Sequence, residues 1–308
     1  MYLLKKIALT GATSTLGIAI INECIRNNIE VLAFVNPKSK NKNRIPVNSR
    51  IKIIPCALED QNKIDITGLT AEVFIHLAWQ SSNRLVRNNL IPQIENIQYS
   101  VDSVTLAEKL GCFTWVGAGS QAEYGNANVR LTENTYPAPV TAYGMAKLCA
   151  GQMTRLECNK YKIKHIWPRI LSTYGPNTQD TTILNYTIRS LLEGKSPNLT
   201  RCEQIWDFLY VGDAARALLL LADKGKNGET YIVSSGKACA MKQYIEIIKD
   251  KINVDIHIGY GKIPYDENSI MYLEGDISKI KKEVGFEPTI IFEDGIDKTI
   301  AWAKNYYV

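Results

Sequence analysis

The chain has 308 residues, a formal net charge of +5, 45% hydrophobic residues and 22% charged residues, as is usual for a soluble globular protein. No long basic stripe interleaved with aromatic residues is present, which argues against nucleic-acid binding. No apolar run reaches the length of a membrane span, and the first residues lead into a β-prone segment without the pattern of a signal peptide. We therefore expect a cytoplasmic protein with neither a nucleic-acid nor a membrane partner.

The cysteines and histidines indicate neither a disulfide framework nor a metal centre. The seven cysteines are scattered, odd in number and never spaced as C-x-x-C, as expected for reduced thiols. The three histidines, His76, His165 and His257, do not stand at metal-ligand spacing with other candidate ligands. We expect no metal site.

Apolar β-prone segments alternate with helical patterns through the first half of the chain. Strands are predicted near 5–10, 30–35, 50–54, 72–77, 113–116 and 163–169, and helices near 16–27, 90–110 and 142–161. This alternation predicts an α/β fold with a Rossmann-type, doubly wound parallel sheet that is covered on both faces.

After residue 176 the pattern is less regular. Helices are predicted near 181–193, 211–223, 241–252 and 293–305, and strands near 205–210 and 230–234. We assign residues 1–172 to a dinucleotide-binding domain, to which 205–234 are expected to return. Residues 173–308 are assigned to a smaller C-terminal substrate domain.

A glycine-containing loop follows the first predicted strand, at residues 11–17 (GATSTLG). Gly11 permits a tight turn after the strand, and Gly17 permits close packing of the next helix on the sheet. The helix N-terminus would point backbone N–H groups at a diphosphate, and Ser14, where such loops often carry glycine, is small enough to approach it. The alternative is an ordinary βα turn without a ligand. We favour a cofactor site that includes Gly11, Thr13, Ser14, Thr15, Leu16 and Gly17.

The end of the second predicted strand bears on the choice of cofactor. NAD-preferring sites usually place Asp or Glu there to hold the ribose 2′-hydroxyl, whereas a 2′-phosphate needs cations. Here Asn36 and Lys38 follow the strand and no acid is in place. The pattern favours NADP(H) over NAD(H), and the alternative is a plain solvated loop.

A Tyr and a Lys lie four residues apart, at Tyr143 and Lys147, and would therefore be neighbours on one helical face. An ammonium beside a phenol favours the phenolate and makes the tyrosine a usable acid or base. In isolation the pattern is weak, because a solvated Tyr/Lys pair is the commoner explanation.

Together with its neighbours, this pair resembles the extended short-chain dehydrogenase/reductase family, in the branch of nucleotide-sugar epimerases, dehydratases and reductases. The resemblance covers nearly the whole chain and follows the family's motif order. The matching segments are TGATSTLG at 10–17, VFIHLA at 73–78, GSQAEYG at 119–125, YGMAK at 143–147, RILSTYGP at 169–176 and DFLYVGD at 207–213.

The resemblance implies roles for individual residues. Ser120 would hydrogen-bond the substrate's carbonyl oxygen, and Tyr143 would pass a proton to or from that oxygen as hydride moves. Lys147 would bind the nicotinamide ribose and lower the pKa of Tyr143 from its reference near ~10. The cofactor site would also include Leu58, Leu77, Ala78 and Trp79, although core packing is an equally good explanation for Trp79.

The residues after Ser120 narrow the chemistry. Dehydratases of the family carry two acids at the positions of Gln121 and Ala122, and some epimerase-reductases carry Cys at the second. Without them, hydride transfer at one carbonyl carbon remains, as in a ketoreductase or a 4-epimerase. We favour NADP(H)-dependent reduction of a nucleoside-diphosphate 4-keto-6-deoxy sugar for surface glycans, as in enzymes resembling the abequose and paratose synthases. One reason is Trp206, which stands where epimerases usually place Arg.

Two other functions remain open. The first is an NAD-dependent nucleotide-sugar 4-epimerase. The second, less expected because Ser120, Tyr143 and Lys147 are all retained, is a non-catalytic dinucleotide sensor. The family resemblance further implies a homodimer through the helices near 90–110 and 142–161. Predicted substrate contacts are Gln80, Gln121, Tyr174, Asn177 and Arg201.

Overall fold

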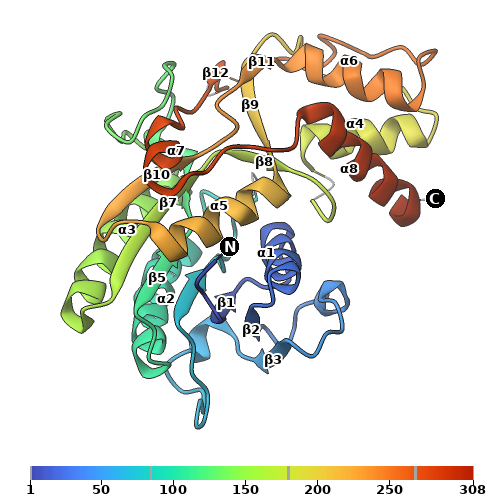
Figure 1. The fold of residues 1–308 in the computed structure, drawn as a ribbon. Helices are drawn as coiled ribbons and strands as arrows, with labels where there is room; N and C mark the ends of the chain where they lie inside the picture. The colour runs from blue at the N-terminus through green and yellow to red at the C-terminus, as the bar shows by residue number, and fades with distance from the viewer. Residues whose placement is uncertain (1, 84, 179–180, 267–268, 308) are drawn as a thin grey trace.

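A parallel sheet forms the centre of the N-terminal part of the molecule (Figure 1). The computed structural model describes residues 2–83, 85–178, 181–266 and 269–307. In these residues the sheet has eight strands in the order β10-β7-β5-β4-β1-β2-β3, with β6 pairing to β7, and all pairings are parallel. The strands are β1 (Lys6–Thr10), β2 (Glu30–Val35), β3 (Ile51–Pro55), β4 (Val73–His76), β5 (Thr114–Gly117), β6 (Gly119–Ser120), β7 (Lys164–Ile170) and β10 (Glu229–Val233).

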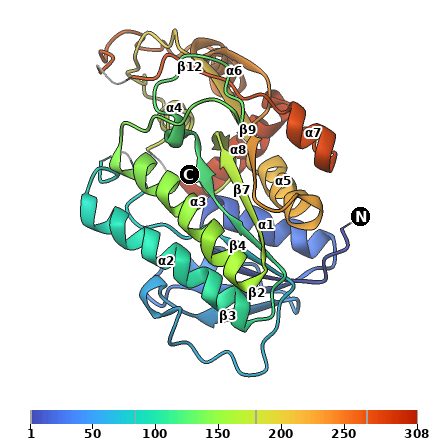
Figure 2. The ribbon, with the colours of Figure 1, turned by 90° about the vertical axis from the view of Figure 1, so that its left-hand side faces the viewer.

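Helices cover both faces of this sheet, which confirms the predicted doubly wound α/β fold. On one face lie α1 (Thr15–Arg26) and α5 (Val211–Lys224), and on the other lie α2 (Leu90–Lys109) and α3 (Ala142–Tyr161), side by side in Figure 2. Strand residues alternate between the two cores because successive side chains point to opposite faces. Ile7 and Leu9 join the core under α1 and α5, whereas Ala8 joins the core under α2 and α3.

A second, smaller sheet lies beyond the first. It consists of β8 (Ser172–Tyr174), β9 (Ile205–Tyr210), β11 (Ala238–Ala240) and β12 (Tyr272–Leu273). A third core is formed with helices α4 (Ile183–Leu192), α6 (Met241–Ile252) and α8 (Phe292–Tyr307). Of the segment 205–234, which we expected to return to the first sheet, α5 and β10 do so. Its residues 205–210 instead form β9, at the centre of the second sheet.

The elements that the sequence does not predict are all short. Besides β6, β8, β11 and β12, they are helix α7 (Ser278–Val284) and the 3₁₀ turns η1 (Lys42–Arg44), η2 (Leu58–Asp60) and η3 (Gln121–Tyr124). Apart from α7, which has seven residues, these elements have two to four residues each, too few for a clear period of 2 or 3.6 in the sequence.

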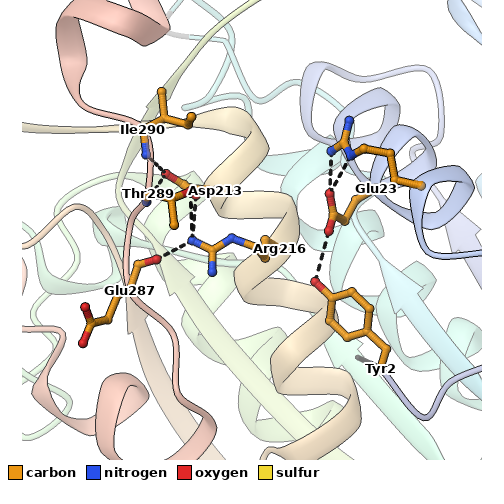
Figure 3. A network of polar contacts seen from close by, with 8 residues as sticks. Tyr2, Glu23, Asp213, Arg216, Glu287, Thr289 and Ile290 are labelled. Atoms are coloured by element: carbon orange, nitrogen blue, oxygen red, sulfur yellow. Dashed lines mark hydrogen bonds and ion pairs between the residues drawn. The ribbon is translucent and has the colours of Figure 1, made fainter.

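A buried carboxylate in α5 ties the chain before α8 to the first sheet (Figure 3). Asp213 accepts hydrogen bonds from the backbone N–H groups of Thr289 and Ile290, both at 2.9 Å, and from the Thr289 hydroxyl at 2.9 Å. Arg216 donates to Asp213 at 2.8 Å and also to the Glu287 carbonyl. The segment leading into α8 is therefore anchored by a buried, fully hydrogen-bonded acid.

Two histidines lie in an aromatic stack inside the first domain. The rings are nearly parallel: Trp115 and His165 are 5.3 Å apart at 14°, Trp167 lies 6.3 Å from Trp115 and 6.1 Å from His165, and His76 lies 6.1 Å from Trp115. Burial lowers the pKa of His76 and of His165 to about 3, with smaller contributions from the charges of Lys147 and Arg155 respectively. Both imidazoles are therefore neutral in the folded protein at moderately acidic pH.

The buried histidines predict a loss of stability in mild acid. Below pH ~6.5 the imidazoles of His76 and His165 bind protons in the unfolded chain but stay neutral in the folded chain. The free energy of unfolding must therefore fall as pH falls. We expect a loss of roughly 1–2 kcal/mol per histidine between about pH 7.5 and pH 5, measured by urea unfolding. His165→Phe should keep the stack and remove about half of the loss, and His257→Gln, at an exposed histidine, should leave it intact. Equal stability at both pH values would contradict the prediction.

Candidate functional site

A cavity of about 660 Å³ opens at the carboxyl ends of β1, β2 and β4. This is where ligands of open α/β sheets bind, beside the point at which the strand order reverses. No Asp or Glu is among the described residues that line it. Many of the predicted site residues do line it, namely Gly11, Thr13, Ser14, Asn36, Lys38, Leu58, Leu77, Ala78, Trp79, Gln80, Ser120, Tyr143 and Lys147.

The phosphate loop is shaped for close approach of a ligand to the backbone. Gly11 has a φ of +69°, and a Cβ there would lie 2.8 Å from the Ala78 nitrogen; a Cβ on Gly17 would lie 2.3 Å from the Gly11 carbonyl oxygen. The Ser14 hydroxyl caps α1 by accepting a hydrogen bond from the Gly17 N–H at 3.0 Å. Its own hydrogen stays available to donate toward a phosphate. The loop therefore fits a dinucleotide diphosphate at the start of α1.

The loop after β2 folds beside the phosphate loop. The Asn36 side chain accepts a hydrogen bond from the Lys38 N–H at 2.8 Å, and the hydroxyls of Ser39 and Thr13 lie 3.2 Å apart. Lys38, Ser39 and Asn41 line the cavity here. This end of the cavity thus offers one ammonium group and several neutral polar groups to a ribose or its phosphate.

Ser120 and Tyr143 meet at the far end of the cavity. Ser120 ends β6, which pairs with β7, and Tyr143 lies in the first turn of α3, which is capped by the Thr141 side chain. Both side chains line the cavity, and the Ser120 hydroxyl lies close enough to the Tyr143 phenol to lower its pKa. A substrate oxygen in contact with both would receive a hydrogen bond and a transferable proton at once.

Trp79 and Lys147 complete this end of the cavity. The Lys147 ammonium donates to the Ala118 carbonyl at 2.8 Å and lies 3.6 Å from the centroid of the Trp79 ring. Trp79 also meets Tyr143 edge-on at 5.9 Å, and its Nε1 donates to Gln93 at 2.8 Å. Trp79 therefore supports the two predicted catalytic side chains as well as lining the cavity.

The structure corrects the expected effect of Lys147 on Tyr143. Burial raises the pKa of Tyr143 to about 12, an effect that the nearby Ser120 hydroxyl opposes, and burial lowers the pKa of Lys147 to about 7, an effect that the charge of Glu123 opposes. The Lys147 ammonium lies 5.8 Å from the centroid of the Tyr143 ring and turns toward Ala118 and Trp79. Sharing one helical face places the two side chains together without placing the ammonium at the phenol oxygen.

Comparison with known proteins assigns the chain to a family. The family model described as the NAD dependent epimerase/dehydratase family matches residues 7–234. The chain belongs to this family.

Relatives in the epimerase/dehydratase family extend over the full chain. A putative UDP-glucose 4-epimerase of Methanocaldococcus jannaschii is 28% identical over 312 residues, covering 97% of this chain and 98% of the relative. The solved UDP-N-acetylglucosamine 4-epimerase of Methanobrevibacter ruminantium superposes with a TM-score of 0.89 at 23% identity, covering 98% and 99% of the two chains. The UDP-glucuronic acid 4-epimerase of Bacillus cereus, solved with UDP-glucuronic acid and NAD, gives 0.85 at 20% identity, covering 98% of this chain and 100% of its own. At these identities the solved structures show the shared fold.

Several residues that we expected in an epimerase/dehydratase site lie elsewhere. Tyr174 is buried in the third core and donates to the Phe292 carbonyl at 3.2 Å, because the alternation along β8 turns its ring inward. The Asn177 carbonyl accepts from the Thr15 hydroxyl at 2.6 Å and from Arg44 at 3.3 Å, and Asn177 lines a second cavity of about 400 Å³ between α1 and α5. Thr15 lines that second cavity as well, and Arg201 is exposed.

The remaining predicted residues lie in or next to the motifs. Leu16 and Gly17 lie in the first turn of α1, behind the residues that line the cavity. Gln121 follows Ser120 in η3, and its side-chain oxygen is buried without a hydrogen-bond partner among the described residues. Trp206 donates to the Ser172 hydroxyl at 2.8 Å and packs beside Phe208, which supports a packing role.

Sequence reasoning missed one functional candidate inside a recognised motif. Glu123 lies within the GSQAEYG segment, where it counts only as a spacer between Ser120 and Tyr124. Its side chain is fully buried and paired with Arg169 at 2.7 Å. Glu123 is a charged residue between two motif positions, in a segment that must pack under the site. Charged residues are seldom buried without a partner, and this pattern could have identified Glu123 as a candidate.

Proposed function

We propose that the chain is a nucleotide-sugar 4-epimerase that oxidises and re-reduces one carbon of its substrate. The observation that carries this proposal is the cavity itself, which unites Ser120, Tyr143 and Lys147 and has no acid among its described lining residues. Such a set supports reversible hydride and proton transfer at a single carbon and offers no acid/base pair for elimination. A relative and a solved structure that span nearly the whole chain are described as 4-epimerases, and they support the same choice over the ketoreductase that the sequence alone favours. A dTDP-glucose 4,6-dehydratase of Neisseria gonorrhoeae spans the chain as well, at 23% identity.

The nearest acid does not replace the missing dehydratase pair. Glu123 follows directly after Gln121 and Ala122, but its carboxylate lies beneath the site and accepts hydrogen bonds from Ser120, Trp167 and Arg169. A carboxylate held in this way has no path to a substrate proton, because its oxygens face the protein interior. Elimination of a hydroxyl is therefore not part of the proposal.

The mechanism follows from the geometry of the chain's own residues. The nicotinamide, when bound, supplies the hydride acceptor; the N-terminal amides of α1 and the Ser14 hydroxyl would hold its diphosphate, and Lys147 its ribose. To take the proton from the 4-hydroxyl of the sugar, Tyr143 must be a phenolate, a form that the positive charge of a bound oxidised nicotinamide would favour. The Ser120 hydroxyl donates to the same sugar oxygen as it becomes a carbonyl. After the sugar presents its other face, Tyr143 returns the proton. The same three residues, Ser120, Tyr143 and Lys147, therefore serve the oxidation of the 4-hydroxyl and the reduction of the 4-keto group, as an epimerase requires.

A ketoreductase that uses NADP(H) is the second candidate. It is favoured by one specific observation: Lys38 lines the cavity at the end of β2, together with Asn36 and Ser39, and the described residues that line this cavity include no acid. A cation there suits a 2′-phosphate. We therefore propose that the cofactor is NAD(H) if the chain is an epimerase and NADP(H) if it is a ketoreductase, so that one experiment decides both the cofactor and the reaction.

We further propose that two copies of the chain pair through α2 and α3. The outer faces of these helices carry large apolar side chains that are roughly half exposed or more, and such clusters mark interaction sites. A four-helix contact would cover them. They are Leu90, Ile91, Ile94, Met145, Met153 and Leu156.

One experiment separates the epimerase from the reductase. The purified protein is incubated, without added cofactor, with UDP-glucose, UDP-N-acetylglucosamine and UDP-glucuronic acid, and the products are resolved as C4 epimers. In parallel, 4-keto nucleotide sugars are supplied with NADH or NADPH, and oxidation of the coenzyme is followed. We expect C4 epimers and bound dinucleotide in the purified protein. Stoichiometric NADPH oxidation with a 4-keto sugar, and no epimer from any UDP-sugar, would overturn the epimerase in favour of the reductase.

A further inference from the structure

The carboxylate of Glu123 lies directly beneath the backbone of Ser120. Its Oε1 accepts a hydrogen bond from the Ser120 N–H at 2.8 Å, and the Ser120 hydroxyl oxygen accepts one from the Ala122 N–H at 3.2 Å. These two contacts close a capping box around η3. The orientation of Ser120 is therefore determined from within the turn that follows it.

Two side chains of β7 hold this carboxylate in place. Arg169 Nε donates to Oε2 at 2.7 Å, and Trp167 Nε1 donates to Oε1 and Oε2 at 3.0 and 3.2 Å. The Arg169 guanidinium in turn lies 4.5 Å from the centroid of the Tyr124 ring. The side chains of Glu123 and Arg169 are 0% and 9% exposed. Burying a charged pair this deeply costs desolvation energy, so the pair is weak evidence for a role in stability. We therefore look for its role in the site above it.

β7 is the strand against which Ser120 is also paired. Gly119 and Ser120 form β6 and pair with Arg169 and Ile170. The strand that anchors the carboxylate is thus the strand that aligns the serine, so the backbone of Ser120 is held on two sides. Ser120 and Tyr143 both line the cavity.

We propose that Glu123 is a positioning residue of the hydride-transfer site: anchored by Arg169 and Trp167, its carboxylate fixes the backbone of Ser120 so that the Ser120 hydroxyl meets the hydroxyl of Tyr143 and the substrate oxygen. Glu123 does not touch the substrate. The expected effect on kcat rests on the proposed function. The expected effect on hydrogen exchange of the Ser120 amide does not depend on it.

A matched pair of double variants tests the proposal. Both carry Arg169→Met, so that no charge is left unpaired in the interior. Glu123→Leu removes the acceptor for the Ser120 N–H, and Glu123→Gln keeps an acceptor oxygen of nearly the same shape. With Leu, we expect kcat to fall about 10- to 100-fold with KM changed less than about threefold. With Gln, kcat should recover to within about fivefold of the unmodified enzyme.

The Ser120→Ala background separates positioning from general destabilisation. If Glu123 acts through Ser120, adding Glu123→Leu and Arg169→Met to the Ser120→Ala variant should lower kcat by less than about threefold relative to Ser120→Ala alone. A structural role alone predicts the same loss in both backgrounds, and predicts that the Leu and Gln variants fall alike. Asp213→Asn, at another buried acid with an arginine partner, is the control: it should lower the thermal midpoint and leave kcat within about twofold at a temperature where it stays folded.

Hydrogen exchange gives a readout that needs no substrate. In the Leu variant the Ser120 amide should exchange at least about tenfold faster, whereas the Gln variant and Asp213→Asn should leave it protected. Unchanged exchange in the Leu variant would overturn the proposal. Absence of any nucleotide-sugar turnover in the unmodified protein would overturn the proposed function instead, and the exchange result would still decide the role of Glu123.

Discussion

Replacing Tyr143 with phenylalanine is expected to lower kcat by about 10²–10⁴-fold, the usual contribution of a positioned general acid or base. The change deletes one oxygen from a side chain that lines the cavity together with Ser120. The ring would keep its edge-on contact with Trp79, so the shape of the cavity should be preserved. Affinity for the dinucleotide should therefore change by less than about threefold, which titration calorimetry can measure alongside steady-state turnover.

The same variant tests whether the chain is an enzyme at all. A dinucleotide sensor would bind its ligand through the phosphate loop and would not need the Tyr143 hydroxyl. Tyr136→Phe, at a tyrosine that is 82% exposed, is the matched control and should keep full turnover. Turnover in Tyr143→Phe above about a tenth of the unmodified level would refute the assigned proton transfer.

Replacing Gly17 with alanine is expected to weaken dinucleotide binding by about 10- to 100-fold, because overpacking at a rigid backbone contact costs about 1–3 kcal/mol. The added Cβ would lie 2.3 Å from the Gly11 carbonyl oxygen. Gly11 belongs to the loop after β1 and Gly17 to the first turn of α1, so the loop must open or α1 must shift. Either movement displaces the N-terminal amides that would hold the diphosphate.

Fluorescence titration with NADH and NADPH measures this effect directly. Asn22→Ala is the control, since Asn22 is an exposed residue of the same helix and lines the second cavity rather than the proposed cofactor cavity. It should bind both coenzymes as the unmodified protein does. Full affinity in Gly17→Ala would show that the loop does not hold the diphosphate.

Local patterns in the sequence predict most of the large elements. The six parallel strands β1 to β5 and β7, and helices α1, α2 and α3, fall within a few residues of their predicted ranges, because burial on both faces requires runs of apolar residues. The spacing of Gly11 and Gly17, and of Tyr143 and Lys147, is likewise a local property. The phosphate loop and the catalytic trio could therefore be proposed without a structure.

Contacts between distant segments left no comparable signal. Tyr174 stands in a recognised motif, yet its ring joins the third core, because the short strand β8 pairs with β9 from a distant part of the chain. The side chain of Lys147 turns toward Ala118 and Trp79, which only packing against β5 and the loop after β4 can determine. Its expected effect on the pKa of Tyr143 failed for this reason.

By itself, the sequence determined the doubly wound fold and predicted the phosphate loop, since both depend on periodicity or spacing along a few turns of chain, and the family resemblance of its motifs implied Ser120, Tyr143 and Lys147 as the catalytic trio. Only the tertiary structure decided which side chains surround that trio. Glu123 shows the difference most clearly: its partners Trp167 and Arg169 lie 44 and 46 residues away in the chain, and no local pattern encodes a contact that exists because β6 and β7 are paired in one sheet.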